Sequence, residues 1–373
     1  MMLDISREDF LPVLQRVTGI VEKKYVLPIL EFVLIETEGD LLRLTTTDGE
    51  IEVVANRTLE KPPESDMAFA VPAHKLLNIC KSFSNDAVIQ LDYNEENSKV
   101  IVKSGKSRFT LSSYGKMDFP CRLEEDLENP NFQIPANFIK DALDRTAFAM
   151  AVNDARYYLN GVLFDAKNDG LNVVATDGHR MAWVKLPMAL DVEENIQSIV
   201  PRKTALELNK RLVEAGSDNV AVHLNKKFIR FAMEGVILTS KLIDGRYPDY
   251  MTVVPNLDNC EYRFNVPVQG FTQALKRAAI MTQEKFKTVR MVVETNLLKI
   301  IAQFEGEEAE ESIDIEFDKE ALEMGFNVSY LLDTINVIDT GDVELAFRDV
   351  GSATLFIPNG EPNYTYVVMP VRL

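Results

Sequence analysis

Cysteine and histidine are scarce in this chain of 373 residues, and their scarcity excludes several classes of protein. The three cysteines, Cys80, Cys121 and Cys260, are odd in number and far apart. This argues against a disulfide framework and favours a reducing compartment, which we expect to be the cytoplasm. The three histidines lack the spacings that metal sites require. We therefore expect neither a metal nor a cofactor.

Long apolar runs are also missing, since none approaches the roughly 18 residues that a membrane helix needs. The acidic N-terminal stretch 1–9 does not resemble a signal peptide. The chain has 40 Lys and Arg against 58 Asp and Glu, a net charge of −18. Such acidity normally counts against nucleic acid, although net charge does not say where basic side chains gather. The length allows two or three domains.

Motifs of catalysis are absent from the sequence. Neither Gly-x-Ser-x-Gly nor Gly-x-Gly-x-x-Gly occurs. Gly105-Lys106-Ser107 resembles the end of a phosphate-binding loop, but Val100 stands where its first glycine is required. A hairpin turn is the better interpretation, because strand-like residues flank the glycine on both sides. An enzyme is therefore the weakest hypothesis.

Internal repeats organise the chain. The segment 42–49, which ends in Thr47-Asp48-Gly49, returns at 171–178, an offset of 129 residues from Asp48 to Asp177. Val71-Pro72 returns as Val200-Pro201 at the same offset, and a fainter third copy covers 298–302 and 327–332. Recurrence in the same order at matched offsets predicts three similar units.

Each unit is expected to contain a helix, strands, a second helix and further strands. Apolar residues at helical spacing predict first helices over Leu11–Val17, Ile139–Met150 and Phe271–Ala279, and Pro72 and Pro201 predict the start of second helices. Ser6 with Asp9 indicates a helix start, although Pro12 leaves that boundary open. Short β-rich runs lie at 100–102, 109–111, 220–224 and 237–240.

These patterns predict an α+β fold. We expect three similar domains over residues 1–125, 126–253 and 254–373, each with antiparallel sheets and two helices. We expect linkers at Cys121–Asn131, which is acidic and contains Pro130, and at Met251–Cys260, which contains Pro255.

The segment from Thr176 to Met181 brings Asp, His and Arg together, which suggests a functional site. Asp-Gly between apolar residues is, however, a strong signal for a hairpin turn, and Asp48-Gly49 occupies the same place in the first unit. We therefore assign Asp177-Gly178 to the turn. The residues that differ between the two units, from His179 onward, are the functional candidates.

The repeats and four motifs together resemble a known family. The motifs are Arg156-Tyr157-Tyr158-Leu159-Asn160-Gly161, Thr176-Asp177-Gly178-His179-Arg180, Asp244-Gly245-Arg246-Tyr247-Pro248-Asp249-Tyr250 and Val368-Met369-Pro370-Val371-Arg372-Leu373. From end to end the chain resembles the bacterial DNA sliding clamps, the β subunits of DNA polymerase III.

The resemblance implies a non-catalytic, head-to-tail homodimeric ring of six domains around duplex DNA, associated with the nucleoid. It implies that a clamp-loader complex installs the ring with ATP. The implied partners of the ring are the α subunit of the replicative polymerase, other polymerases, and repair factors that carry clamp-binding peptides.

Residues for DNA contact follow from the resemblance and from the basic side chains of the helices that would line the ring. The family's positions correspond to Lys24, Asn153, Tyr157 and Tyr158, with Asn153 where the family usually has Gln. The basic candidates are Lys75, Arg202, Lys203, Lys276 and Arg277, together with Lys140, Arg145, Lys210 and Arg211. For each of these alone, a solvated helix face is the alternative.

Opposite charges near the two ends of the chain suggest a contact between subunits. The alternative is two ordinary charged strand edges that discourage aggregation. The resemblance favours the contact between subunits, with an apolar centre and charged flanks. Its residues are Lys75, Ile79, Phe83, Lys99, Lys106, Arg108 and Phe109 on one side, and Ile280, Met281, Glu307, Glu308, Glu310 and Glu311 on the other.

The resemblance also implies a site for partner peptides between the second and third units. Its residues are Leu159, Thr176, Gly178, His179, Arg180, Met181, Pro248, Val253, Asn327, Tyr330, Val367, Met369, Pro370, Val371 and Arg372. The family often has Leu in place of Met181 and Met in place of Val371, and both exchanges keep the site apolar. Alternatively, some of these residues complete the core of the third unit.

Two hypotheses of different classes remain from the sequence. The first is a processivity clamp that encloses DNA. The second is an acidic ring for protein interactions that never encloses DNA. Clustering of the basic residues on one inner surface would distinguish the two.

Overall fold

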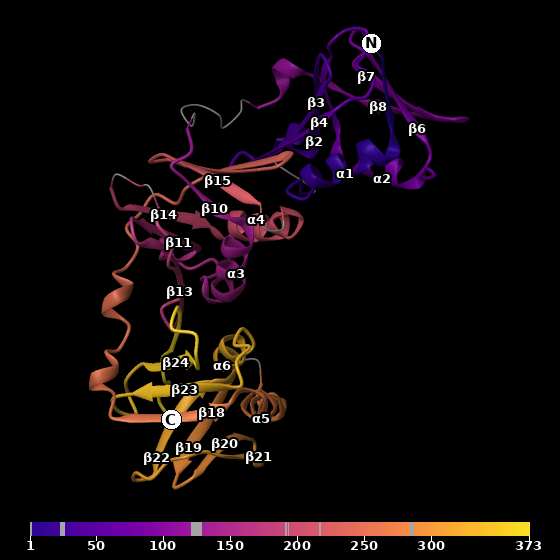
Figure 1. The fold of residues 1–373 in the computed structure, drawn as a ribbon. Helices are drawn as coiled ribbons and strands as arrows, with labels where there is room; N and C mark the ends of the chain where they lie inside the picture. Colours follow the sequence, from indigo (N-terminus) through magenta and orange to yellow (C-terminus); the bar gives the residue numbers. More distant parts are fainter. Residues whose placement is uncertain are drawn as a thin grey trace. The chain divides into compact units, whose positions relative to one another are not determined.

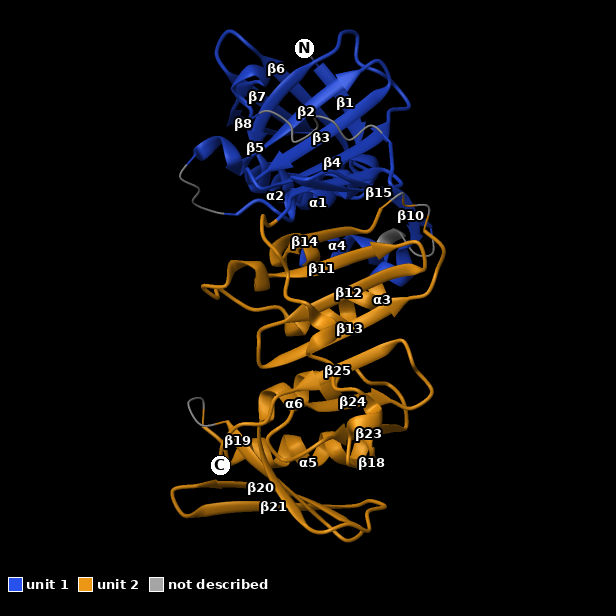
Figure 2. Cartoon of the chain, turned by 90° about the vertical axis from the view of Figure 1, so that its left-hand side faces the viewer, with its two compact units in different colours: residues 1–139, 206–242 blue, residues 140–205, 243–373 orange. Residues whose placement is uncertain are grey.

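A computed structural model describes residues 2–22, 27–120, 129–190, 192, 194–215, 218–283 and 287–373. The chain forms two compact units, each described here by itself (Figure 2). Unit 1 comprises residues 1–139 and 206–242, and unit 2 comprises residues 140–205 and 243–373. The division passes through the central third of the chain. Strands β10 and β15–β17 of this third join a sheet of unit 1, whereas its strands β11–β14 join a sheet of unit 2.

Unit 1 contains a nine-stranded sheet of order β10-β15-β16-β17-β4-β3-β2-β5-β9 and a four-stranded sheet of order β1-β6-β7-β8. Helices α1 (Arg7–Thr18) and α2 (Ala73–Ser82) pack against each other (Figure 1). The strands are β1 Met2–Ser6, β2 Phe32–Glu38, β3 Leu41–Thr47, β4 Ile51–Thr58, β5 Ala68–Pro72, β6 Val88–Asn94, β7 Lys99–Ser104, β8 Ser107–Ser112, β9 Tyr114–Gly115, β10 Phe132–Pro135, β15 Asn219–Leu224, β16 Phe228–Met233 and β17 Val236–Lys241.

Unit 2 contains an eight-stranded sheet of order β14-β11-β12-β13-β25-β24-β23-β18 and a four-stranded sheet of order β21-β20-β19-β22. Helices α5 (Val268–Ile280) and α6 (Val328–Ile335) pack against each other. The strands are β11 Gly161–Lys167, β12 Gly170–Thr176, β13 Arg180–Leu186, β14 Ile196–Pro201, β18 Tyr262–Pro267, β19 Thr288–Glu294, β20 Leu297–Phe304, β21 Glu307–Asp314, β22 Leu322–Asn327, β23 Asp342–Phe347, β24 Thr354–Pro358 and β25 Tyr364–Val368.

Helices α3 (Ala136–Thr146) and α4 (Arg202–Ala215) are each divided between the units. The three thirds of the chain therefore carry two α-helices each, as the sequence predicted. All paired strands of the described sheets are antiparallel. The α+β class with antiparallel sheets is confirmed.

Local signals explain several element boundaries. The Ser6 hydroxyl accepts a hydrogen bond from the Asp9 amide at 3.0 Å, so Ser6 caps α1 as predicted. The helix continues through Pro12, which removes only one backbone hydrogen bond near its start. Helix α2 begins directly after Pro72, as expected.

Two other predictions had different outcomes. The hairpin at Gly105-Lys106 is confirmed, since Ser104 pairs with Ser107 and Gly105 has a φ of +54°. The prediction that the helix of the second unit reaches Met150 was wrong. Helix α3 ends at Thr146 and is followed by a 3-10 turn over Ala147–Ala149. The linker stretch 121–128 lies outside the described residues.

The sheets repeat one plan three times. Each repeat contains two half-sheets. In the first, second and third repeats, one half-sheet ends in β8, β17 and β25, respectively, and the other ends in β4, β13 and β21. Strand β17 pairs with β4, and β25 pairs with β13, so these two joints fuse half-sheets into larger sheets. Strands β8 and β21 have a single partner each among the described strands, β7 and β20. No helix in the described part of the chain is long and apolar enough to cross a membrane.

Candidate functional site

The turn between β12 and β13 is built from side-chain hydrogen bonds. The Thr176 hydroxyl donates to the Arg180 carbonyl at 2.7 Å and accepts from the Gly178 amide at 3.0 Å. Asp177 Oδ1 accepts from the amides of His179 and Arg180 at 2.9 and 3.0 Å. Gly178 has a φ of +86°, which favours glycine.

The same bonds recur in the first third of the chain. The Thr47 hydroxyl bonds to the Ile51 carbonyl at 2.8 Å and to the Gly49 amide at 3.0 Å, and Asp48 Oδ1 accepts from the amides of Glu50 and Ile51. Gly49 has a φ of +90°. The prediction that Asp-Gly serves the turn is therefore confirmed atom by atom.

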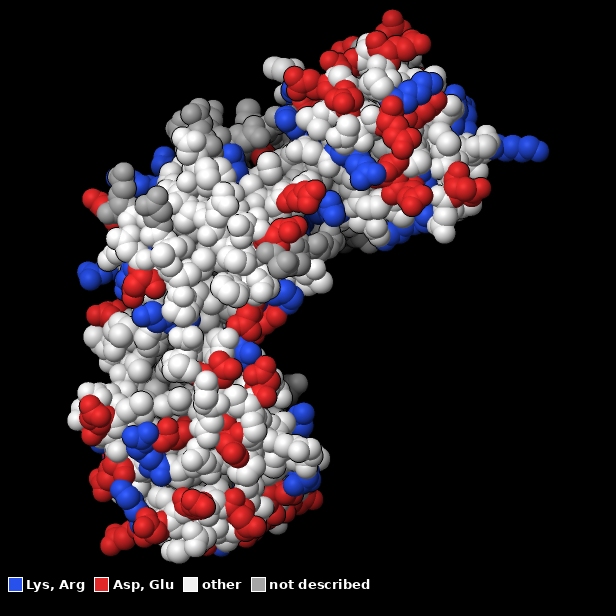
Figure 3. All heavy atoms as spheres, in the orientation of Figure 1, with Lys and Arg blue, Asp and Glu red and all other residues white. Residues whose placement is uncertain are grey.

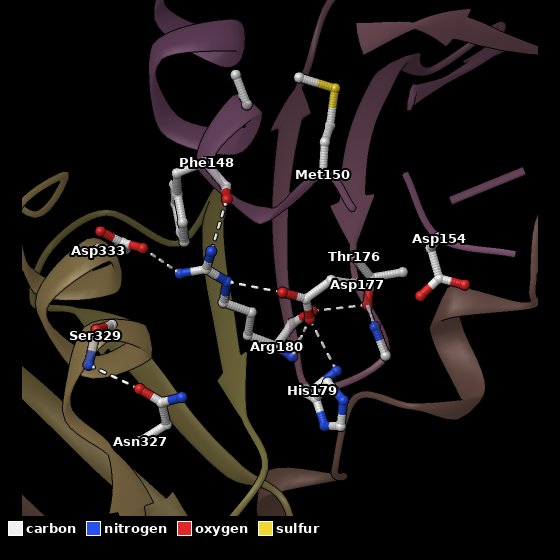
Figure 4. Close-up of polar contacts among 12 residues, drawn as sticks. Phe148, Met150, Asp154, Thr176, Asp177, His179, Arg180, Asn327, Ser329 and Asp333 are labelled. Atoms are coloured by element: carbon white, nitrogen blue, oxygen red, sulfur yellow. Dashed lines mark hydrogen bonds and ion pairs between the residues drawn. The ribbon is translucent and has the colours of Figure 1, made fainter. Parts of the chain in front are cut away.

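Arg180 lies at the centre of a polar cluster (Figure 4). Its guanidinium donates to Asp177 Oδ2 at 3.2 Å, to Asp333 Oδ2 on α6 at 2.5 Å, and to the Phe148 carbonyl at 2.9 Å. Its Cζ atom lies 4.6 Å from the centre of the Tyr330 ring. The side chain is only 10% exposed, so these contacts replace the water that it loses.

Tyr330 and Asn327 bring α6 to the same place. The His179 ring stacks on the Tyr330 ring with centroids 6.0 Å apart. Asn327 caps α6, because its Oδ1 accepts from the Ser329 amide at 2.9 Å. Burial raises the pKa of Tyr330, which therefore keeps its hydroxyl proton at neutral pH.

The C-terminal tail after β25, residues 369–373, joins two sheets of unit 2. The Met369 amide donates to the His179 carbonyl at 2.8 Å, and the Val371 amide donates to the Gly325 carbonyl on β22 at 2.8 Å. A Cβ atom on Gly325 would lie 2.8 Å from Leu373 Cδ2, so the tail passes close over this glycine. The structure thus brings Gly178, His179, Arg180 and the tail together.

The apolar candidates divide into two groups. Leu159, Met181 and Val367 are 2%, 2% and 1% exposed and belong to one core cluster with Tyr247 and Tyr250. These three side chains therefore belong to a core that draws on both the second and the third repeats. The exposed candidates of the whole site are Gly178, His179, Pro248, Val253, Met369 and Arg372, while Thr176, Asn327, Tyr330, Pro370 and Val371 are partly exposed.

Sequence reasoning missed several residues of this region. Phe148 and Asp333 hold Arg180, although they lie 32 and 153 residues away from it in the chain. The Arg156 guanidinium donates to the Asp177 carbonyl at 2.9 Å and to both oxygens of Asp154. Arg156 lowers the pKa of Asp154 to about 2 through these hydrogen bonds, so the pair stays ionised at neutral pH. Of these residues, only Arg156 belonged to a motif that the sequence analysis had identified.

The joint between β4 and β17 in unit 1 differs at the equivalent positions. Met181 faces Val367 in the β13–β25 pair, and Glu52 faces Thr239 in the β4–β17 pair. Glu52 and Thr239 are 1% and 2% exposed. At this one buried pair, the joint is therefore polar in unit 1 and apolar in unit 2.

The candidates for DNA contact lie on several elements. Lys75 on α2 and Lys276 on α5 are exposed, as are Asn153 and Tyr157, while Tyr158, Arg202 and Lys203 are partly buried. Asn153 has a φ of +55°, which asparagine tolerates better than most residues. Lys24 lies outside the described residues. On the face that Figure 3 draws, acidic and basic side chains are interspersed over each unit.

Arg277, a candidate for DNA contact, is paired with a candidate for the contact between subunits. Its Nε and Nη2 atoms donate to the two carboxylate oxygens of Glu311 at 2.7 and 2.5 Å. A DNA candidate and an interface candidate therefore meet in one bidentate ion pair on α5 and β21. The helix candidates Lys140, Lys210 and Arg211 also pair with acids of their own helix, Asp144 and Glu207.

The interface candidates cluster on two strand edges and the helices beside them. In unit 1, Phe109 on β8 is 38% exposed and its ring lies 6.1 Å from that of Phe83. In unit 2, Ile280 at the end of α5 is 76% exposed. Two of the remaining candidates, Ile79 and Met281, are partly exposed. The others are exposed, namely Lys75, Lys99, Lys106, Arg108, Glu307, Glu308 and Glu310.

The same plan of half-sheets occurs three times, and exposed apolar side chains of the C-terminal tail lie at one joint. This arrangement fits the class of sliding clamps. Family models of the N-terminal, central and C-terminal domains of the DNA polymerase III beta subunit match residues 1–124, 133–249 and 251–372. The chain belongs to this family, the beta sliding clamps. It is a non-catalytic accessory subunit that acts in DNA replication as a processivity clamp.

Individual relatives agree with this assignment. The chain is 42% identical to the beta sliding clamp of Pseudomonas aeruginosa and 38% identical to that of Escherichia coli K12, with full coverage of each chain. Among solved structures, a DNA polymerase sliding clamp from Pseudomonas aeruginosa superposes with a TM-score of 0.94 at 41% identity over the whole of both chains. One from Caulobacter crescentus also superposes with a TM-score of 0.94, at 31% identity over the whole of both chains.

Proposed function

We propose that two copies of this chain close head to tail into a ring around duplex DNA. The repeat of the half-sheets carries the proposal. Strands β17 and β25 each pair with a strand of the preceding repeat, β4 and β13. Their counterpart in the first repeat, β8, lies 129 residues before β17, and the counterpart of β4 and β13 in the third repeat is β21. A third joint of the same kind therefore needs a β8 from one copy and a β21 from another.

The chemistry of the two edges supports this pairing. Lys106 and Arg108 lie at or on β8, and Glu307, Glu308 and Glu310 lie on β21, all exposed. Opposite charges steer and orient two copies, while the exposed Phe109 and Ile280 provide apolar area to bury. Unlike surfaces at opposite ends of a chain form closed rings when the rotation between copies allows it. We propose 1–125, 126–253 and 254–373 as the domains that such a ring repeats.

The ring would hold DNA without reading its sequence. Contacts between basic side chains and phosphates bind non-specifically, with a Kd of about 10⁻⁴–10⁻⁶ M at physiological salt. Closure removes the need for tighter contacts, because escape then requires an interface to break. We propose Lys24, Asn153, Tyr157, Tyr158, Lys75, Arg202, Lys203 and Lys276 for this role. Arg277 contributes less, because Glu311 already neutralises it.

The surface around Arg180 would bind the peptides of partner proteins. An extended peptide with apolar side chains would cover Met369, Val253 and Leu373, which are 36%, 44% and 63% exposed. One Pseudomonas aeruginosa clamp structure is described as bound to griselimycin, so a related clamp binds such a compound. We propose the replicative polymerase α subunit, other polymerases, repair factors and the clamp loader as partners, in the cytoplasm and at the nucleoid.

Retention on circular DNA tests enclosure directly. The clamp is loaded on a nicked circle with a matched loader and ATP, passed through a high-salt sizing column, and the circle is then cut. We expect the clamp to stay on the closed circle and to leave the linear form, because only topology holds it at high salt.

The controls separate enclosure from binding. Equal retention on circular and linear DNA would show that contacts hold the protein. If the protein never loads while the same loader installs a control clamp, a protein-interaction ring without DNA is the better description.

A further inference from the structure

The β4–β17 joint of unit 1 and the β13–β25 joint of unit 2 differ in the surroundings of one arginine, which lies on helix α1 in unit 1 and on helix α3 in unit 2. Four buried residues of α1, Phe10, Val13, Leu14 and Val17, correspond to four buried residues of α3, Ile139, Ala142, Leu143 and Thr146. Each pair is separated by 129 residues. Arg16 on α1 is therefore the counterpart of Arg145 on α3.

In unit 2 an aromatic ring of the chain itself fills the space at this arginine. Arg145 Cζ lies 4.3 Å from the centre of the Tyr364 ring. The Tyr364 hydroxyl donates to Asp141 Oδ2 at 2.9 Å, and Arg145 Nε donates to Asp141 Oδ1 at 2.8 Å. The Tyr364 ring, the Arg145 guanidinium and the Asp141 carboxylate thus each contact the other two.

In unit 1 the strand position equivalent to Tyr364 carries a valine. Tyr364 faces Val184 in the β13–β25 pair, and Val236 faces Ala55 in the β4–β17 pair, so register gives Val236 the place of Tyr364. A Cβ atom on Gly235 would lie 3.2 Å from Arg16 Nη1, which puts this guanidinium beside β17. A cavity of about 510 Å³ opens here, and Arg16, Asn56, Arg211 and Val236 contribute to its lining.

Two buried polar atoms of this lining have no hydrogen-bond partner among the described residues, Arg211 Nε and Asn56 Oδ1. The Arg211 side chain is 8% exposed, and its other nitrogens bond to Glu207 and to the Arg16 carbonyl. A buried polar group without a partner destabilises the folded protein, so a ligand that supplies the missing hydrogen bond is favoured. One of the two atoms is a donor and the other an acceptor, and a hydroxyl group can satisfy either.

The charge of the cavity indicates a neutral ligand. Three arginines line it, Arg16, Arg57 and Arg211, and so do four acids, Glu8, Asp9, Asp218 and Glu234. Arg57 is already paired with Asp9. An anion would meet the remaining carboxylates, whereas a neutral aromatic ring gains a cation–π contact with an arginine.

We propose that this cavity binds a phenol group, either the side chain of a tyrosine in a partner or a small phenolic molecule. The ring lies against Arg16, as Tyr364 lies against Arg145, and the hydroxyl reaches Arg211 Nε or Asn56 Oδ1. The volume is within the range of small-ligand sites. This site lies at a different joint from the peptide surface around Arg180 and does not depend on ring closure.

The test titrates the full chain with p-cresol and with N-acetyl-tyrosinamide, observed by saturation-transfer NMR. For ligands of this size we expect a Kd on the order of 1 mM. N-acetyl-phenylalaninamide, which lacks the hydroxyl, should bind several-fold more weakly. Equal binding of both small phenols identifies the ring as sufficient, and binding of the tyrosinamide alone identifies a tyrosine within a peptide as the ligand.

Two variants localise the binding. Val236→Tyr supplies the missing ring from β17 itself and should abolish binding while raising the melting temperature. Ile237→Tyr adds the same ring to the opposite face of the strand and should leave the affinity unchanged, because neighbouring strand residues point to opposite faces. Unchanged binding in Val236→Tyr, or no binding of either phenol to the native chain at about 10 mM, would overturn the proposal.

Discussion

At the scale of single residues, the turn sequence Thr-Asp-Gly occurs twice in the chain, in different surroundings. Thr47-Asp48-Gly49 and Thr176-Asp177-Gly178 make the same hydrogen bonds, and both glycines have positive φ. The surroundings differ. A Cβ atom on Gly49 would meet nothing within 4 Å, whereas one on Gly178 would lie 2.6 Å from Arg156 Nη1. The turn itself is structural, and the Arg156 guanidinium close to Gly178 distinguishes the second turn from the first.

Alanine at the two glycines separates these contributions. We expect Gly49→Ala and Gly178→Ala each to lower the free energy of unfolding by about 1 kcal/mol, because both positions require positive φ. Only Gly178→Ala should weaken peptide binding, several-fold, because Arg156 must move from the Asp177 carbonyl. Denaturant unfolding and fluorescence anisotropy with a clamp-binding peptide measure both effects.

The matched pair provides its own control. If Gly49→Ala weakened peptide binding as much as Gly178→Ala, the loss would reflect general destabilisation and Arg156 would have no role at the site.

Sequence patterns predicted these turns because Asp-Gly acts locally. They did not predict what holds Arg180. Asp333 comes from α6, and Phe148 comes from the turn after α3, so the contact depends on how distant elements pack. The sequence also did not predict which side chains are buried. Nothing in the spacing of apolar residues distinguishes Met181, which lies in the core, from Met369, which is exposed.

At the scale of elements, the C-terminal tail connects the site to the core. Its amides at Met369 and Val371 bond to the turn at His179 and to β22 at Gly325. The tail therefore has a fixed backbone and exposed apolar side chains, an arrangement that offers a partner a surface with little entropy to lose. The sequence predicted the tail as part of the site only through resemblance.

Truncation of the tail's side chains tests its contribution. Met369→Ala combined with Leu373→Ala should weaken peptide binding by at least tenfold, since two exposed anchors lose their apolar area. The backbone bonds of the tail survive, so the oligomeric state should not change. Fluorescence anisotropy measures the affinity, and native mass spectrometry checks the assembly.

A matched variant is Val350→Ala with Met117→Ala, two exposed apolar residues elsewhere in the chain. Native-like affinity in the tail variant would show that the peptide contacts other residues.

At the scale of the whole molecule, we propose that the edges of β8 and β21 determine assembly. Phe109→Asp with Ile280→Asp would bury unpaired charge in the proposed interface, which strongly disfavours association. We expect this variant to have the mass of one chain, 42.1 kDa, in native mass spectrometry, and the native protein to have twice that mass.

Met117→Asp with Val350→Asp adds the same charge at exposed positions away from both edges. It should remain a dimer. A dimer in the Phe109 and Ile280 variant as well would mean that the copies meet through other surfaces.

At one joint the buried pair Met181 and Val367 lies close to the C-terminal tail in the chain, and at the other joint the equivalent positions hold Glu52 and Thr239. We expect partner peptides to bind only at the first of these two joints. A ring of two such chains would offer two docking places instead of four. A third partner could then join only by displacing another, so the order in which replication and repair proteins act would depend on their relative concentrations and affinities.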